Sequence, residues 1–380
     1  MTQVHITGVG MTRFGKHPDS DATDLGAAAL LEAIADAGID ARLIESAYVG
    51  HVFQGMVMGQ RILAQVGLAG LPLVNVENAC SSGATAIREA SLAIRAGEND
   101  VVVAVGTEHL TSQFAGALTP DPSDPEAAIG ATMPGIYAMR ATRYMADHGM
   151  TREQLALIPV KNKANAAQNP LAHFRKAITV EDVLESRAVA DPLRLHDCSP
   201  VTDGAAAVIM MSDRAAAKYA NGRGVKLAAS SLRSGSVDVE PTSMTYEPLT
   251  WATALDAYEK AGIGPEDVDF AEVHDCFSIA EVLRVEGLGL FEQGSYPRAV
   301  ERGEANIDGR LPVNPSGGLI GKGHPLGGTG VAQVVELVRQ LRGEAGDRQI
   351  EGANIGLAHC RGGKAVGIEG AACTVQIVTR

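Results

Sequence analysis

The chain has 380 residues, 46% hydrophobic and 4% aromatic, with a formal net charge of −13. This composition predicts two or three packed α/β units, and the acidic balance disfavours non-specific binding to nucleic acid or anionic membranes. The uncharged run at 62–76 is too short for a membrane span, the first residues lack a signal-peptide core, and the five cysteines have no framework spacing, so we expect a cytoplasmic protein with free thiols.

The first element with candidate chemistry is VNVENACSSGATAIREA, residues 74–90. Cys80 stands where a strand-like run ends and a helix begins, at about Ser81, with apolar residues at helical spacing as far as Ile94. A buried strand, Val101 to Val105, follows. The helix start favours a thiolate, which makes Cys80 a candidate nucleophile. The alternative is a small buried core residue.

A basic island follows the Pro/Asp/Gly-rich linker at residues 119–135. Between residues 140 and 176 the chain carries seven basic side chains and two acidic ones. The basic ones are Arg140, Arg143, Arg152, Lys161, Lys163, Arg175 and Lys176. Charge alone leaves two interpretations open, a solvated helical face or a docking surface for an anionic ligand.

The tripeptide His-Asp-Cys occurs twice. At 196–198 it leads into a strand, and we interpret it as structural. At 274–276 it follows the strand-like VDFAEV and opens a helix. It therefore lies at the carboxyl end of a strand, where the sites of α/β proteins gather.

The run NPSGGLIGKGHPLGGTG, residues 314–330, holds seven glycines and His324. A helix is predicted from about Val331 to Leu341, so His324 precedes it as Cys80 precedes the first helix. A buried core histidine is the alternative, but the position suits a base that takes the proton of Cys80. The matching plan of the two stretches indicates duplicated α/β halves.

The last strand-like segments carry the remaining candidates. Cys360 precedes a glycine turn in LAHCRGG, and Cys373 lies inside the strand-like AACTVQIV, which is typical of core. Neither Cys-x2-Cys nor His-x3-His spacing occurs, so we expect no metal site, and no phosphate-binding loop of the Gly-x4-Gly-Lys type is found.

Together, NACSSGATA, HDCFS, GGLIGKGHPLGGTG and CRGG, in this order, resemble the thiolase superfamily. The nearest branch holds sterol-carrier-protein-type thiolases and acetyl-CoA acetyltransferases. The resemblance implies an α/β fold, a five-layer αβαβα sandwich of two duplicated halves with an inserted loop domain. The first half would comprise residues 1–118 and 197–235, the coenzyme A-binding loop domain 119–196, and the second half 236–380.

The resemblance also implies roles for the candidate residues. Cys80 would be acylated after activation by His324, and His274 with His324 would form one oxyanion hole. The backbone N–H groups of Cys80 and Gly362 would form a second oxyanion hole. A second thiol would move the Cα proton, with Cys360 preferred over Cys276. The run RGGKAVGIEGAAC after Cys360 is longer than the glycine turn of the family.

Coenzyme A enters as a substrate, with no permanently bound cofactor. The side chains expected to hold its phosphates are Arg143, Lys161 and Lys163. The expected activity is that of an acyl-CoA thiolase in either direction. The alternatives are a decarboxylating ketoacyl-synthase-like condensing enzyme, a retro-aldolase of the same superfamily, and a non-catalytic acyl-CoA-binding subunit. The family implies a homodimer or tetramer, and some relatives have a small zinc-ribbon/OB-fold partner.

Overall fold

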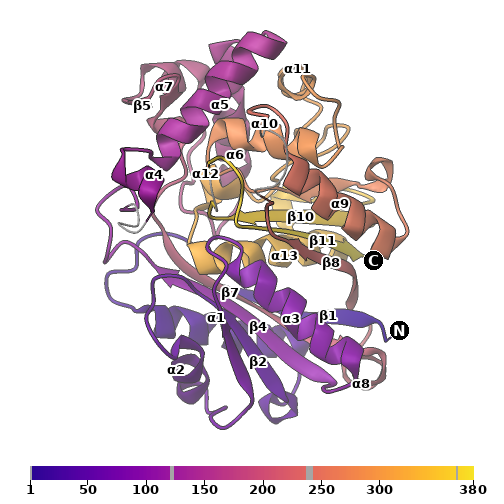
Figure 1. The fold of residues 1–380 in the computed structure, drawn as a ribbon. Helices are drawn as coiled ribbons and strands as arrows, with labels where there is room; N and C mark the ends of the chain where they lie inside the picture. Colours follow the sequence, from indigo (N-terminus) through magenta and orange to yellow (C-terminus); the bar gives the residue numbers. More distant parts are fainter. Residues whose placement is uncertain (1, 120–123, 237–242, 365–366) are drawn as a thin grey trace.

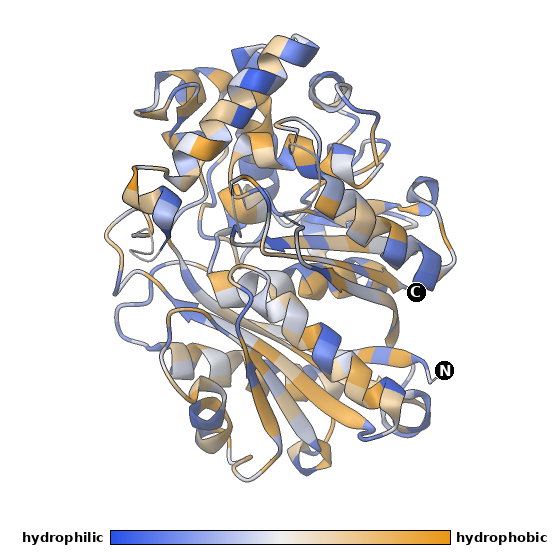
Figure 2. Ribbon diagram, in the orientation of Figure 1, coloured by the Kyte–Doolittle hydropathy of each residue, from blue (hydrophilic) through white to orange (hydrophobic). Residues whose placement is uncertain are grey.

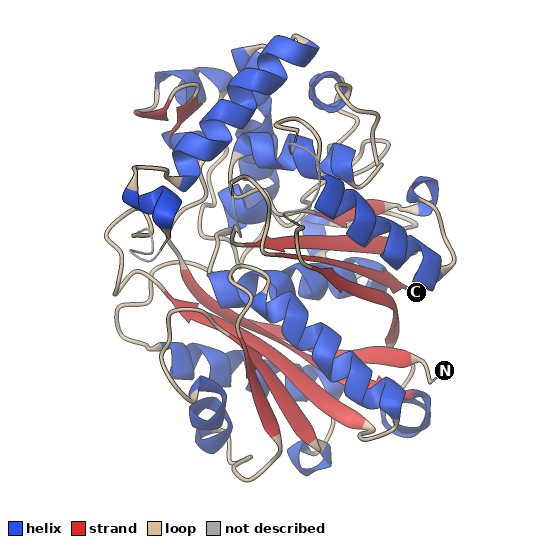
Figure 3. Cartoon of the chain, in the orientation of Figure 1, coloured by secondary structure: helices blue, strands red, loops and turns tan. Residues whose placement is uncertain are grey.

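The structure, a computed structural model, describes residues 2–119, 124–236, 243–364 and 367–380. Over these residues nine strands form one continuous sheet, and two short strands form a separate hairpin (Figures 1 and 3). The strands of the large sheet are β1 (Val4–Met11), β2 (Ser46–Gly50), β3 (Leu73–Val76), β4 (Val101–His109), β7 (Asp203–Ser212), β8 (Val225–Arg233), β9 (Phe270–Glu272), β10 (Ile355–Gly362) and β11 (Ala372–Thr379). The hairpin consists of β5 (Ala188–Ala190) and β6 (Leu193–Arg194).

The strand order of the large sheet reveals the internal duplication. It runs β3-β2-β4-β7-β1-β8-β11-β10-β9. In the first half β4, β7 and β1 pair antiparallel, with β2 parallel to β4. In the second half β10, β11 and β8 repeat this pattern, with β9 parallel to β10. A short pairing of β1 with β8 joins the halves. By pairing, β8 groups with the second half, whereas the sequence division placed residues up to 235 with the first.

Helices cover both halves and fill the space between them. The helices of this framework are α1 (Ala22–Ala37), α2 (Met58–Gln65), α3 (Ser82–Ala96), α8 (Asp213–Tyr219), α9 (Pro248–Ala261), α10 (Ser278–Gly287), α11 (Tyr296–Glu301), α12 (Gly318–Lys322) and α13 (Leu326–Arg342). Helix α1 packs on β1, β4 and β7, and α9 packs on β8 and β11. Helices α3 and α13 contact each other and strands of both halves. The result is the expected αβαβα arrangement.

Three apolar cores follow from these layers. One lies between α1 and the first half, one surrounds α3 and α13, and one lies between the second half and α9 and α10. Strand β4 is buried along its whole length, and its apolar residues stand out in Figure 2. The sequence prediction that this strand is covered on both faces is therefore confirmed.

The inserted segment lies between β4 and β7 in the chain. It contains α4 (Pro125–Ala128), α5 (Met133–His148), α6 (Arg152–Ala167), α7 (Val180–Glu185) and the β5–β6 hairpin. Helix α6 packs against α10, α11 and α12 (Figure 1). The insertion thus rests on the second half, beside the segments that carry His274 and His324.

Candidate active site

Cys80 lies in a tight turn between β3 and α3. Ala79 adopts a left-handed backbone conformation, with φ of 47°, which is costly for a residue that has a Cβ atom. The Ser81 N–H donates to the Asn78 carbonyl at 3.0 Å, and Ser81 is the N-cap of α3. Cys80 therefore lies two residues before the first residue of α3, Ser82. The predicted helix start at about Ser81 would have put it one residue before the helix.

The charge state of Cys80 differs from the sequence expectation. Burial raises the pKa of its thiol to about 12, although the backbone N–H groups of Gly363 and of Cys80 itself act to lower that pKa. Desolvation outweighs the helix start because the thiol lies before the N-cap, and the neighbouring Cys276 and Glu108 raise the pKa further. These causes favour a neutral thiol at rest, whereas the helix start alone would favour the thiolate that the sequence predicts.

His324 lies between α12 and α13 with a defined tautomer. Its Nδ1 is 2.7 Å from Thr329 Oγ1, and that hydroxyl donates its hydrogen to the Pro325 carbonyl at 2.9 Å. The hydroxyl can therefore only accept from the imidazole, so Nδ1 carries the proton and Nε2 is free. Burial lowers the pKa of His324 to about 3, which keeps the ring neutral. A neutral imidazole with a free nitrogen is a base.

His274 and His324 converge on Cys80 from different parts of the chain. One ligand atom from each of Cys80, His274 and His324 lies within 4.8 Å of the others. The two imidazole rings have centroids 5.0 Å apart and planes at 84°. Burial and the neighbouring His324 hold the pKa of His274 well below its usual range. A sulfur and two nitrogens at this spacing also suit zinc, so the expected absence of a metal stays a prediction.

Cys360, on β10, completes the group. Its thiol donates to the Cys80 carbonyl at 3.0 Å and lies 3.4 Å from His274 Nδ1. Burial and the nearby Cys80 raise the pKa of Cys360 well above its usual value. The structure thus brings Cys80, His274, His324 and Cys360 together.

Cys276, two residues after His274, is buried and influences the pKa of Cys80. Burial raises the pKa of the Cys276 thiol, whereas Arg284 and a hydrogen bond with Tyr137 oppose that rise. The Tyr137 hydroxyl in turn accepts from Arg284 Nη2 at 2.7 Å. Cys276 is therefore a second buried thiol near the centre, with a cation and a phenol beside it.

Gly362 packs directly against the turn that carries Cys80. A Cβ atom there would overlap the Asn78 carbonyl and lie 3.0 Å from Ser81 N. The backbone N–H that acts on the Cys80 thiol belongs to the next residue, Gly363. Part of the long segment after Cys360, residues 365–366, lies outside the described residues.

The basic island divides into buried and exposed side chains. Lys161 is buried, with its Nζ 3.1 Å from a Glu281 carboxylate oxygen and 2.7 Å from the Val313 carbonyl. Lys163 is also buried, with Nζ 4.2 Å from the Phe174 ring centroid. Arg143 is exposed and pairs with Asp147 one turn along α5. Neither sequence interpretation describes the whole island, because two of its charges, Lys161 and Arg140, pair with Glu281 and Glu247 of the second half.

Sequence reasoning missed the residues that support the candidate catalytic side chains. Thr329, which sets the tautomer of His324, lies five residues after it in the glycine-rich motif. A hydroxyl residue within GGTG, so close to the histidine, could have been recognised as its partner. Asp275 and Asn162 meet across 113 positions in the chain, which no local pattern reveals.

Comparisons with known proteins agree with this geometry. Residues 4–214 match the thiolase N-terminal domain, and residues 234–368 match the thiolase C-terminal domain-like family. The acetyl-CoA acetyltransferase of Methanothermobacter thermautotrophicus is 44% identical over 96% of this chain and 97% of its own. The benzoylsuccinyl-CoA thiolase subunit BbsB of Thauera aromatica is 42% identical over 95% of each. The solved Ltp2-ChsH2(DUF35) aldolase superimposes with a TM-score of 0.85 at 24% identity, covering 99% of this chain and 97% of that one. With both family domains matched across most of its length, the chain belongs to the thiolase family.

Proposed function

We propose that this acyl-CoA thiolase works through an acyl-enzyme on Cys80, cleaving a 3-oxoacyl-CoA with coenzyme A or condensing two acyl-CoA molecules. The observation that carries the proposal is the neutral thiol beside a neutral imidazole whose free nitrogen is Nε2. As Cys80 attacks the acyl carbon, His324 takes its proton. The resulting Nε2–H, together with His274, can then hold the thioester oxygen of the acyl-CoA whose Cα gains or loses a proton.

A second oxyanion hole would serve the tetrahedral intermediate on Cys80. We assign it to the backbone N–H of Cys80 and to the Gly362–Gly363 turn, because Gly362 packs on the nucleophile turn and the Gly363 N–H acts on the thiol. These donors belong to fixed backbone, so they need no reorganisation when charge develops.

The acyl-enzyme is tested directly by intact-protein mass spectrometry after adding acetyl-CoA or acetoacetyl-CoA. We expect an acyl adduct that is lost in Cys80→Ser and slowed by about 10²–10⁴ in His324→Ala, the usual range for losing an acid–base group. An adduct that persists in Cys80→Ser would refute the assignment. A non-catalytic acyl-CoA-binding subunit would give no adduct.

The thiol that exchanges the Cα proton is proposed to be Cys360. Its contact with the Cys80 backbone and with His274 places it against the acylated residue. Without this thiol, Cys80 should still be acylated by acetyl-CoA, but exchange of the acetyl α-protons with deuterium should collapse. If Cys360→Ala keeps the exchange and Cys276→Ala loses it, the assignment passes to Cys276.

Coenzyme A is proposed to lie along α5. The helix begins beside the centre, where Tyr137 contacts Cys276, and continues to the exposed Arg143. An open groove of about 480 Å³ is lined by Ala138, Met139, Thr142, Arg143 and Ala190, among others. Lys161 is left out of this proposal because its amino group is already paired with Glu281.

Charge reversal tests the groove. Arg143→Glu should raise KM for the acyl-CoA more than it lowers kcat, since a phosphate contact serves ground and transition states alike. Arg302→Glu is the matched control, because Arg302 is similarly exposed and also pairs with a nearby carboxylate, that of Glu304. Equal changes of KM in the two variants would mean that Arg143 is an ordinary solvated surface residue and does not bind coenzyme A.

We also infer a homo-oligomer in the cytoplasm that can include a partner protein. Strand β3 is the edge of the sheet, and its Val74 is 49% exposed, which favours pairing with another edge. The names of BbsB, a thiolase subunit, and of the Ltp2-ChsH2(DUF35) aldolase support a partner.

Among the described residues no helix combines the length and apolar character needed to cross a bilayer. Light scattering after size exclusion tests the oligomer, and a monomeric mass would refute it.

A further inference from the structure

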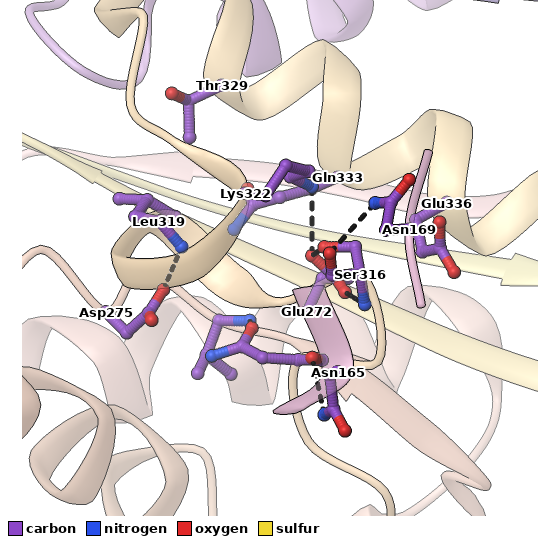
Figure 4. Close-up of polar contacts among 12 residues, drawn as sticks. Asn165, Asn169, Glu272, Asp275, Ser316, Leu319, Lys322, Thr329, Gln333 and Glu336 are labelled. Atoms are coloured by element: carbon purple, nitrogen blue, oxygen red, sulfur yellow. Dashed lines mark hydrogen bonds and ion pairs between the residues drawn. The ribbon is translucent and has the colours of Figure 1, made fainter. Parts of the chain in front are cut away.

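Asp275, between His274 and Cys276, is a fully buried carboxylate that grips the segment carrying His324. Its Oδ1 accepts from the Leu319 N–H at 2.6 Å (Figure 4), and its Oδ2 accepts from the Ile320 N–H at 3.3 Å. Both N–H groups belong to α12, which ends two residues before His324. One carboxylate therefore links the backbone next to one catalytic histidine to the segment that leads into the other.

The glycine-rich motif is built around this carboxylate. Gly318 has φ of +59°, and a Cβ atom there would overlap the Asp275 carboxylate. The Asp275 carboxylate therefore explains why position 318 of the motif is a glycine. Glu272 holds the same segment from β9, accepting from the Ser316 N–H at 2.9 Å. This second contact is also drawn in Figure 4.

Asn162 extends the link to α6 of the inserted segment. Its amide nitrogen donates to Asp275 Oδ2 at 2.7 Å and to Glu281 Oε2 at 2.6 Å. A Cβ atom on Gly321 would lie 2.7 Å from the Asn162 carbonyl, so α6 and α12 are in close backbone contact. A shift of α6 would therefore displace α12, which precedes His324.

The hydrogen bonds require an ionised Asp275. Burial and the neighbouring Glu281 raise the pKa of Asp275 well above its usual value, and the N–H groups of Leu319 and Ile320 oppose that rise. All its hydrogen-bond partners are donors, namely two backbone N–H groups and one side-chain amide. A protonated carboxyl group would direct its own hydrogen at one of them.

We propose that Asp275 and Asn162 are positioning residues for the reaction, which hold His274 and His324 in the arrangement that acylation of Cys80 needs and tie that arrangement to α6. The inference rests on the proposed acyl-enzyme function. A displacement of about 1 Å in a reacting group costs on the order of 10²-fold in rate, so small shifts of α12 have a large effect.

The first test replaces Asp275 with Asn, which keeps the shape but turns an NH₂ group toward donors. Rapid-quench mass spectrometry should show Cys80 acylation slowed by about 10- to 100-fold, with KM for the acyl-CoA little changed. Glu286→Gln is the matched control, since Glu286 is a largely buried carboxylate that accepts from Tyr144 and Tyr296 and contacts neither histidine segment. A rate loss that follows the fall in Tm equally in both variants would overturn the proposal.

The second test stays within α6 and does not depend on Asp275→Asn folding. Asn162→Ala should slow acylation, whereas Asn165→Ala should leave it near the wild-type rate, because Asn165 donates to the Asn314 carbonyl and contacts neither carboxylate. Equal rates in the two variants would overturn the link to α6. If wild-type protein gave no adduct on Cys80, the proposed function itself would fail. A normal wild-type adduct with unchanged rates in Asp275→Asn would refute only the positioning role.

Discussion

At the scale of single residues, the centre pairs two groups that burial keeps neutral. The pKa of the Cys80 thiol is raised to about 12, and that of His324 is lowered to about 3. A thiolate–imidazolium pair would put two charges in a poorly solvated site, so in the proposed mechanism the proton moves as the acyl carbon is attacked. We therefore expect Cys80 to react slowly with electrophiles in the absence of substrate.

Alkylation of Cys80 by iodoacetamide checks this charge state. The thiolate is the reactive form, so below the raised pKa the rate should increase about tenfold for each pH unit, with no plateau between pH 6 and 9. The measurement is peptide mapping of Cys80 against Cys198, a partly exposed thiol whose pKa burial also raises to about 12. A plateau near pH 7 at Cys80 would show a stabilised thiolate instead.

At the scale of elements, α3 and α13 bring Cys80 and His324 together by crossing at glycines. A Cβ atom on Gly83 would overlap the Gly327 carbonyl, and one on Gly330 would lie 2.6 Å from the Ala84 backbone nitrogen. The crossing therefore has no room for a methyl group on either side. The separation of Cys80 and His324 depends on it.

Gly83→Ala tests the crossing, and two effects of opposite sign compete. Alanine favours a helix over glycine by about 1 kcal/mol, whereas overpacking costs about 1–3 kcal/mol. Because the overlap is with backbone, we expect the free energy of unfolding to fall and the acylation rate to fall with it, measured by urea unfolding and mass spectrometry. Gly116→Ala is the control, since no atom lies within 4 Å of its added Cβ. A stabilised Gly83→Ala would mean that the helices can separate freely.

The elements also show where sequence reasoning succeeds and where it stops. Strand β4 was predictable because a continuous apolar run has one interpretation in a layered α/β fold. Helix α13 begins at Leu326, before the predicted Val331, because packing against α3 overrides the poor helix propensity of three glycines. Cys80, His274 and His324 were predictable from motifs, whereas Asn162 contacts Asp275 on a distant segment.

At the scale of the whole molecule, buried ionisable groups confine stability to a window of pH. Glu247 is buried among Arg140, Arg284 and Arg361, which hold its pKa well below the usual range despite its burial.

At alkaline pH the buried thiols matter, since burial raises the pKa of Cys373 to about 11. Such a thiol stabilises the folded state fully at a pH below its unfolded pKa, which is near 8.5. As pH rises from there toward 11, the free energy of unfolding falls. The alkaline limit therefore begins near pH 8.5.

The acid limit comes from histidines that cannot be protonated in the folded state. Burial lowers the pKa of His359, like that of His324, to about 3. Below an unfolded pKa of about 6.5 the unfolded chain binds a proton at each such residue and the folded chain does not. The free energy of unfolding therefore falls, as pH falls from 6.5 toward 3, by about 1.4 kcal/mol per pH unit for each histidine.

His359→Gln isolates one of these contributions away from the acylation centre. His359 Nε2 contacts Thr250 and Cys373, and its other ring nitrogen, Nδ1, has no hydrogen-bond partner among the described residues. The variant loses packing at every pH, so the informative quantity is the difference in free energy of unfolding between pH 7 and pH 5. We expect this difference to be smaller by about 2 kcal/mol in the variant, from reversible urea unfolding. An equal difference in both proteins would mean that His359 binds a proton in the folded state, and that water reaches this layer of the fold.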